Sequence, residues 1–241
     1  MRIIVAGSTS VQPYAEILAE AYCDMYPEIA VDIQGGGSSA GGTAAQTGTA
    51  DIGMSSRALN QQEEGLYVIE IAKDGLAIIV NPANPINNLT LEQVSAIYSQ
   101  RIDNWSSLGG NNAKIHVIAR EDGSGTRSAF VDLVMHNSKI SPRAIVQDSN
   151  GAVRQLVADD PNAIGFISLG LVDIGERPVK ALSLDGVAAT HDNVVNGSYN
   201  LTRPFIFVTK SEPRGITLDF INYVLSDEGR RILLAEGLVV D

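Results

Sequence analysis

The 241-residue sequence has few cysteines, few basic residues and no metal-ligand spacing, and each of these shortages excludes a class of function. Its single cysteine, Cys23, excludes an internal disulfide or a cluster of cysteines around a metal. Seventeen Lys and Arg residues stand against 28 Asp and Glu residues, for a net charge of −11, and no basic cluster indicates a nucleic-acid surface. No spacing of His, Cys, Asp and Glu suggests a metal site, so no cofactor is predicted.

Long apolar runs are also absent. None approaches the ~20 residues that span a membrane, and the opening run of residues 1–7 is too short for the apolar region of a signal peptide. We therefore expect a soluble chain. If the natural protein is exported, a signal or lipid-anchor segment has been removed and Met1 is an added start.

The composition is that of a globular protein, with 44% hydrophobic and 19% charged residues. Its length allows one large or two modest domains. Two apolar runs, residues 75–80 and 204–209, resemble buried strands far apart in sequence, and we interpret them as crossings between two lobes. Lobe 1 is expected to comprise residues 1–78 and 206–241, and lobe 2 residues 79–205, with a ligand cleft between them.

Short strand-like runs alternate with helical patterns, which is the signature of the α/β class. Helical spacing of apolar residues is clearest between Pro13 and Pro27, and Thr90 with Gln93 forms a capping box before another helix. The further strands are expected at residues 2–6, 31–34, 51–54, 115–119 and 163–168. Helices are expected at residues 14–25 and 90–98, in the small-residue segment that ends at 47, and within residues 126–136. Another helix is expected to begin near residue 150, and two more lie within residues 216–234.

Three segments share one design, in which a strand ends in Gly, Ser and Thr and a helix begins. They are residues 7–10, 35–39 and 123–126. Free amides at a helix start, hydroxyls and closely approachable glycine backbone suit a phosphate-like anion. One such segment alone is usually a turn or a cap, but three in one chain favour an anion site. No lysine follows any of them as in a nucleotide-binding P-loop.

The segment Arg120-Glu121-Asp122 precedes the third of these segments. Arg120, at the end of a predicted strand, is suited to donate a fork of hydrogen bonds to a tetrahedral anion. Asp122, two residues later, is expected to orient that guanidinium. A surface ion pair is the alternative.

The sequence resembles the phosphate-binding proteins of ABC phosphate importers. The resemblance rests on Arg-Glu-Asp-Gly-Ser-Gly-Thr at 120–126, Gly-Ser-Thr-Ser at 7–10, Gln-Gly-Gly-Gly-Ser-Ser at 34–39 and Ala-Asp-Ile-Gly at 50–53, and it continues through residues 163–166 and 203–205. It implies two α/β lobes of the class II periplasmic binding protein fold, hinged by two crossing strands and closing over one phosphate. It also implies a non-enzymatic, extracytoplasmic, monomeric protein whose partners are inorganic phosphate and a membrane permease.

The resemblance assigns ligand contacts residue by residue. It places around the anion Thr9, the amide of Ser10, Ser38, Arg120, Ser124, the amide of Gly125, and Thr126. It makes Asp122 the partner of Arg120, and Ser8 and Gly37 are expected to support the site from behind.

One position departs from the family pattern. Where many members carry an aspartate that accepts the proton of hydrogen phosphate, this chain reads Ser55-Ser56-Arg57. Losing that carboxylate weakens discrimination against sulfate. Ser56 and Arg57 are expected to contact the ligand, and the alternative for Arg57 is a pair with Glu63 or Glu64.

Three other functions remain as alternatives. The site could bind another tetrahedral oxyanion, sulfate or molybdate, or the chain could be a sensory anion-binding domain. The distant alternative is a serine hydrolase, because residues 37–41 match Gly-x-Ser-x-Gly. Ser38 would then need a histidine, for which His191, beside Asp192, is the only suitable candidate.

Overall fold

The computed structural model describes residues 1–136, 138–174 and 177–240. The chain forms two compact units. The first comprises Met1–Asp74, the short segment Gly123–Gly125 and the chain from Arg203 on, and the second comprises Gly75–Asp122 and Thr126–Thr202. Two of the chain boundaries, 74/75 and 202/203, lie a few residues before the 78/79 and 205/206 expected from sequence.

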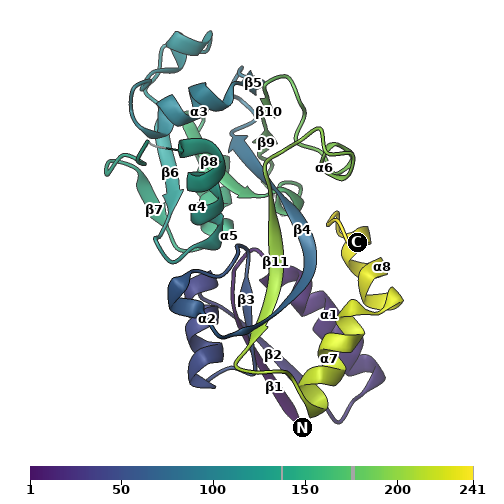
Figure 1. The fold of residues 1–241 in the computed structure, drawn as a ribbon. Helices are drawn as coiled ribbons and strands as arrows, with labels where there is room; N and C mark the ends of the chain where they lie inside the picture. Colours follow the sequence, from purple (N-terminus) through teal and green to yellow (C-terminus); the bar gives the residue numbers. More distant parts are fainter. Residues whose placement is uncertain (137, 175–176, 241) are drawn as a thin grey trace. The chain divides into compact units, whose positions relative to one another are not determined.

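The first unit is built on a mainly parallel sheet in which β1 lies between β2 and β3. Strand β11 pairs antiparallel with β3, and β4 borders β11. Helix α2 covers one face, while α1, α7 and α8 cover the other (Figure 1). The elements are β1 (Arg2–Gly7), α1 (Gln12–Met25), β2 (Ala30–Gly35), α2 (Ser38–Thr47), β3 (Ile52–Ser55), β4 (Tyr67–Val80), β11 (Thr202–Thr209), α7 (Gly215–Leu225) and α8 (Asp227–Ala235).

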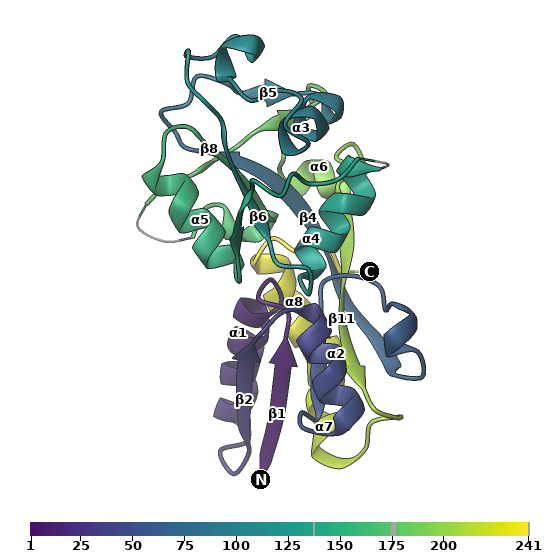
Figure 2. The same ribbon diagram turned by 90° about the vertical axis from the view of Figure 1, so that its left-hand side faces the viewer.

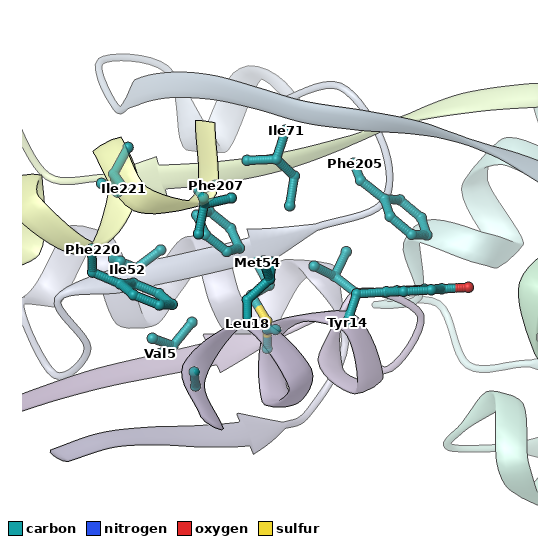
Figure 3. Close-up of a cluster of buried hydrophobic side chains, with 14 of the residues drawn as sticks. Val5, Tyr14, Leu18, Ile52, Met54, Ile71, Phe205, Phe207, Phe220 and Ile221 are labelled. Carbon is teal, nitrogen blue, oxygen red and sulfur yellow. The ribbon is translucent and has the colours of Figure 1, made fainter. Parts of the chain in front are cut away.

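The core of this unit lies between the sheet and α1, α7 and α8. Phe205 and Phe207 of β11 point to this side and meet Tyr14 and Leu18 of α1 (Figure 3). Alternate residues of β11 point to the opposite face and pack with Ala45 of α2. Both faces of β11 are therefore buried, which explains its continuous apolar run.

Small residues bring α2 unusually close to the strands. A methyl group built on Gly41 would lie 2.9 Å from Gly7 Cα and 2.7 Å from the Met54 carbonyl oxygen. Only glycine at this position allows the helix backbone to rest on β1 and β3. The start of α2 is thereby held next to the ends of these two strands.

The second unit has its own sheet, with β8 between β4 and β6, and β7 beside β6. Helix α5 packs on one face, and α3 and α4 lie on the other (Figure 2). On that second face Phe130 stacks on Phe166 at 4.1 Å, beside Tyr98, whose burial raises its pKa well above the usual range. The elements are α3 (Leu91–Tyr98), β6 (His116–Arg120), α4 (Gly125–Phe130), β7 (Ile145–Gln147), α5 (Asn150–Asp159), β8 (Ala163–Ser168) and β9 (Lys180–Ala181).

Smaller elements complete the description. They are a π-helical turn Val131–Met135, β5 (Asn88–Leu89), β10 (Ser183–Leu184), α6 (His191–Val195) and the 3₁₀ turns Gln61–Glu63, Trp105–Leu108 and Leu169–Leu171. The α/β class and the strands and helices expected above are confirmed. Strand β4 begins at Tyr67, well before the apolar run expected at 75–80, and the charged residues Glu70, Lys73 and Asp74 separate its first apolar residues from that run. Among the described residues, no helix combines the length and apolarity needed to cross a membrane.

Candidate anion-binding site

Serines gather at one edge of the sheet in the first unit. In the register of the parallel strands, Gly7 of β1 pairs with Gly35 of β2 and Met54 of β3, so the three strands end at the same level. The segments that follow these strands carry four buried serines, which are 0–2% exposed: Ser8, Ser10, Ser38 and Ser56. The topology therefore collects hydroxyl groups at the carboxyl ends of the strands, where open α/β sheets bind ligands.

Ser8 shapes the turn after β1. Its amide donates to the Met54 carbonyl at 2.9 Å, and its hydroxyl oxygen accepts from the Ser10 amide at 3.2 Å. The Ser10 amide, which the resemblance assigned to the ligand, is thus directed to Ser8. The Ser10 hydroxyl oxygen accepts from Arg203 Nη2 at 3.0 Å. Thr9, between them, is partly exposed.

Ser38 and Ser56 form a pair with one hydrogen to spare. The Ser56 amide donates to Ser38 Oγ at 3.1 Å, and the two hydroxyl oxygens lie 3.4 Å apart. Either hydroxyl can donate its hydrogen to the other, and this uses one of the two hydroxyl hydrogens. Among the described residues the second hydroxyl hydrogen then has no acceptor, although both side chains are fully buried. A ligand oxygen is the natural acceptor.

Arg203 and Asp74 form a buried ion pair that the sequence interpretation missed. Their side chains are 2% and 1% exposed, and Nε and Nη2 of Arg203 donate to one Asp74 oxygen at 3.1 and 2.9 Å. The same guanidinium donates to Ser56 Oγ at 3.3 Å and to Ser10 Oγ at 3.0 Å. The available signal was a pair of opposite charges, each at the entrance of an otherwise apolar strand run.

Arg57 adopts the pairing that was the alternative for it. Its two terminal nitrogens each donate to one oxygen of Glu63 at 2.7 Å, and they also donate to Ala58 O and Ser39 Oγ. The Arg57 and Glu63 side chains are only 10% and 6% exposed, so the pair is buried and does not point outward. Neutralised by Glu63, Arg57 adds no free positive charge to the serine cluster.

The segment Gly123–Gly125 belongs to the first unit. The Ser39 amide donates to the Gly123 carbonyl at 3.1 Å, which ties the segment to the start of α2. Gly37, before this helix, donates its amide to the Gly7 carbonyl at 2.9 Å. A methyl group built on Gly125 would collide with Ser38 Oγ and lie 2.6 Å from Ser56 Oγ. Glycine is therefore required at 125 by close approach to the serine pair. Ser124, also in this segment, is 1% exposed.

In the second unit, Arg120 ends β6 with its side chain 1% exposed. The expected partner, Asp122, was wrong. Nε and Nη2 of Arg120 each donate to a Glu121 oxygen at 2.9 Å, because the longer glutamate side chain folds back over the strand end. Asp122 is 97% exposed and lies 3.1 Å from Arg127.

One nitrogen of Arg120, Nη1, is buried and has no hydrogen-bond partner among residues 1–136, 138–174 and 177–240. An unpaired N–H of a buried cation is costly, so such a group indicates a ligand position. Thr126, six residues on, is also 1% exposed.

The features that a serine hydrolase or a metal site would need are weaker than those that suit an anion. The hydroxyl of Ser38 has only Ser56 groups as partners in the described chain, and His191 begins α6 in the second unit. No His/Cys/Asp/Glu group among the described residues is arranged to hold a metal ion. An open groove of about 490 Å³ between α1 and β2 is lined by Glu16, Glu20 and Asp32, whose charges disfavour an anion.

The chain is similar to known proteins along nearly its whole length. The sequence profile of the PBP superfamily domain matches residues 2–228. The chain is similar to the phosphate-binding protein PstS of Pseudomonas aeruginosa, at 30% identity over 97% of this chain and 81% of that protein.

Two solved structures are also similar. One is a phosphate ABC transporter substrate-binding protein from Clostridium perfringens with bound phosphate, at 41% identity, 100% coverage of both chains and a TM-score of 0.94. The other is an ABC-type phosphate transport receptor from Vibrio cholerae, at 39% identity, coverage of 99% of this chain and 100% of that chain, and a TM-score of 0.79.

Proposed function

Because the chain belongs to the family of phosphate-binding proteins of ABC phosphate importers, we propose that it binds inorganic phosphate and delivers it to the permease of such an importer. The protein acts by binding and makes or breaks no bond. We also propose that it works outside the cytoplasm, where delivery of phosphate to an importer takes place. We retain the expectation that it is a monomer.

The observation that carries the proposal is a surplus of buried donors. In the first unit the Ser38–Ser56 pair has one hydroxyl hydrogen with no acceptor among the described residues, and in the second unit Arg120 Nη1 has none. Protein interiors rarely leave such donors unpaired, because each costs about 1–3 kcal/mol. An oxyanion, which offers only acceptors at its unprotonated oxygens, satisfies them.

Net charge does not oppose this proposal. The chain carries −11 overall, but charge-assisted hydrogen bonds and the start of α2 act at short range, where the distant carboxylates are screened. Several such bonds in a dehydrated site give micromolar affinity or better, about −8 kcal/mol. The prediction that the residues of both units serve one anion is part of this proposal, and variants in each unit test it separately.

The test is isothermal titration of protein freed of bound anions with inorganic phosphate. We expect one phosphate per chain. Ser38→Ala removes a hydroxyl that touches the proposed ligand and is expected to weaken binding about tenfold or more, because a charge-assisted hydrogen bond is lost. Absence of any phosphate-dependent heat in the wild type, with no phosphate retained after dialysis, would refute the proposed function.

Ser226→Ala is a matched control. Ser226 caps α8 with its hydroxyl, accepting from the Gly229 amide at 3.3 Å, and takes no part in the serine cluster. This variant loses a serine hydroxyl of the same unit and is expected to keep the wild-type phosphate affinity.

A further inference from the structure

Arg57 uses all four N–H groups of its two terminal nitrogens within the first unit. Nη1 donates to Glu63 Oε2 at 2.7 Å and to the Ala58 carbonyl at 2.8 Å, and Nη2 donates to Glu63 Oε1 at 2.7 Å and to Ser39 Oγ at 3.0 Å. Each of these nitrogens carries two hydrogens, so none of the four remains for a ligand. An effect of Arg57 on a bound anion must then come through its charge or through the residues that it holds.

Glu63 holds the guanidinium in one orientation. Its two carboxylate oxygens accept from different nitrogens of Arg57, and Oε2 also accepts from the Asn60 amide at 2.9 Å. The carboxylate rests directly on α2, since a methyl group built on Gly42 would lie 2.7 Å from Glu63 Oε1. A pair with two bonds, enclosed in this way, presents its remaining donors in a fixed direction, and its two charges cancel.

Ser39 connects this pair to the segment Gly123–Gly125. It is the second residue of α2, and its amide donates to the Gly123 carbonyl at 3.1 Å. Its side chain faces the same residue, because a methyl group built on Gly123 would lie 3.6 Å from Ser39 Cβ and 3.9 Å from its Oγ. Two residues further on, Gly125 packs on the serine pair. Ser39 therefore links Arg57 to the segment that shapes the anion site.

We propose that Arg57 is a positioning residue, which fixes Ser39 and thereby keeps the segment Gly123–Gly125 packed on the serine pair. Glu63 serves the same purpose by holding Arg57. The inference rests on the proposed function, because Ser124 of this segment is a proposed ligand contact. Since the pair carries no net charge, it contributes by position and not by attraction.

Glu63→Gln separates position from charge. The variant removes one negative charge and loosens the guanidinium. If Arg57 acts by its charge, a guanidinium without its carboxylate attracts the anion more strongly, and phosphate binds more tightly. If Arg57 is a positioning residue, losing its fixed direction weakens binding. We expect isothermal titration to show about fivefold weaker phosphate binding than in the wild type, and equal or tighter binding would overturn the proposal.

Arg57→Lys makes the complementary change. It keeps the positive charge but lacks the fork that reaches Glu63 and Ser39 together. We expect it to weaken phosphate binding about fivefold as well. Wild-type affinity in this variant would assign the effect of Arg57 to its charge and would overturn the proposal.

A double-variant cycle tests the route through Ser39. Ser39→Ala removes the hydroxyl that accepts from Arg57 but leaves the amide that donates to Gly123. Alone, it is expected to weaken phosphate binding about fivefold, and Ser39→Ala/Arg57→Lys about fivefold in total, because both changes break one connection. Independent effects would multiply to about 25-fold. A merely structural role would lower the Tm and leave the dissociation constants unchanged. Either of these two results would overturn the proposal.

Arg231→Met is the control. Arg231 pairs with Glu228 on α8 of the same unit, where both side chains are exposed, and neither residue belongs to the anion site. This variant loses an arginine–glutamate pair and is expected to keep the wild-type phosphate affinity. If Arg57→Lys does not fold, Ser39→Ala, which changes a partly exposed side chain, still tests the proposal.

The titrations also separate this inference from the proposed function. A wild type that binds phosphate, with the same affinity in Glu63→Gln, would overturn the inference alone. A wild type that binds no phosphate would overturn the proposed function itself.

Discussion

Replacing Arg203 by methionine leaves Asp74 buried without its counter-charge. The Asp74 side chain is 1% exposed and accepts both hydrogen bonds from Arg203 Nε and Nη2 on one oxygen, so water cannot replace the guanidinium without opening the unit. Breaking such a pair on one side costs about 3–5 kcal/mol of unfolding free energy. For a chain of this length that corresponds to a fall in Tm of roughly 6–20 °C.

The double variant Arg203→Met/Asp74→Leu identifies the cause. It removes both charges and fills the space with apolar groups, which is often nearly neutral for a buried pair, so we expect it to recover most of the loss. Urea unfolding followed by circular dichroism gives the free energies for the wild type, the two single variants and the double variant. A single Arg203→Met variant that loses less than about 1 kcal/mol, or a double variant no more stable than it, would refute the argument that this pair is dry and closed.

Two further predictions concern the anion site and are checked by phosphate titration. Glu121→Gln is expected to weaken binding about tenfold, because it loosens the side chain that orients Arg120, while the matched variant Asp122→Asn stays within about threefold of the wild type. Equal effects of the two would contradict the observed pairing. Gly125→Ala is expected to weaken binding about a hundredfold, since the added methyl group meets two serine hydroxyls. Wild-type affinity in that variant would show that the close approach does not shape the site.

Much of the fold could be predicted from the sequence because its signals are local. The apolar spacing of α1 between two prolines and the capping box at Thr90 each specify a helix by themselves. The continuous apolar run of β11 indicated a strand buried on both faces, and it is one. The first half of β4 was missed because charged residues interrupt its apolar residues, and β7 was missed because it is only three residues long and largely exposed.

The site was predictable as a set of segments but not as a network of bonds. Strand-end glycines and serines indicated the segments that carry Ser10 and Ser38, and the family resemblance added Ser56. The three serines lie at the same edge of the sheet because β1, β2 and β3 end at the same level. The choice of Glu121 over Asp122 as the partner of Arg120 depends on side-chain length and on the direction of the chain after β6. The spacing of residues in the sequence does not show which of the two acidic side chains reaches Arg120.

Arg203 and Asp74 show the same limit at longer range. They are 129 residues apart and meet only because β4 and β11 lie side by side in the sheet. Arg57 likewise meets Glu63 through a capped 3₁₀ turn whose Asn60 and Glu63 bond each other's backbone. In both cases an arginine that could have bound a ligand is instead paired with a carboxylate from another part of the same unit.

The central claim, that buried donors without protein acceptors exist for an oxyanion, is tested most directly by the phosphate dissociation constant of Arg120→Met. The account predicts a loss of at least about a hundredfold, because a buried charged donor is removed. Arg154→Met is the control in the same unit, where the arginine donates to the Val172 carbonyl, and it is expected to stay within about threefold of the wild type. Wild-type affinity in Arg120→Met would contradict the account.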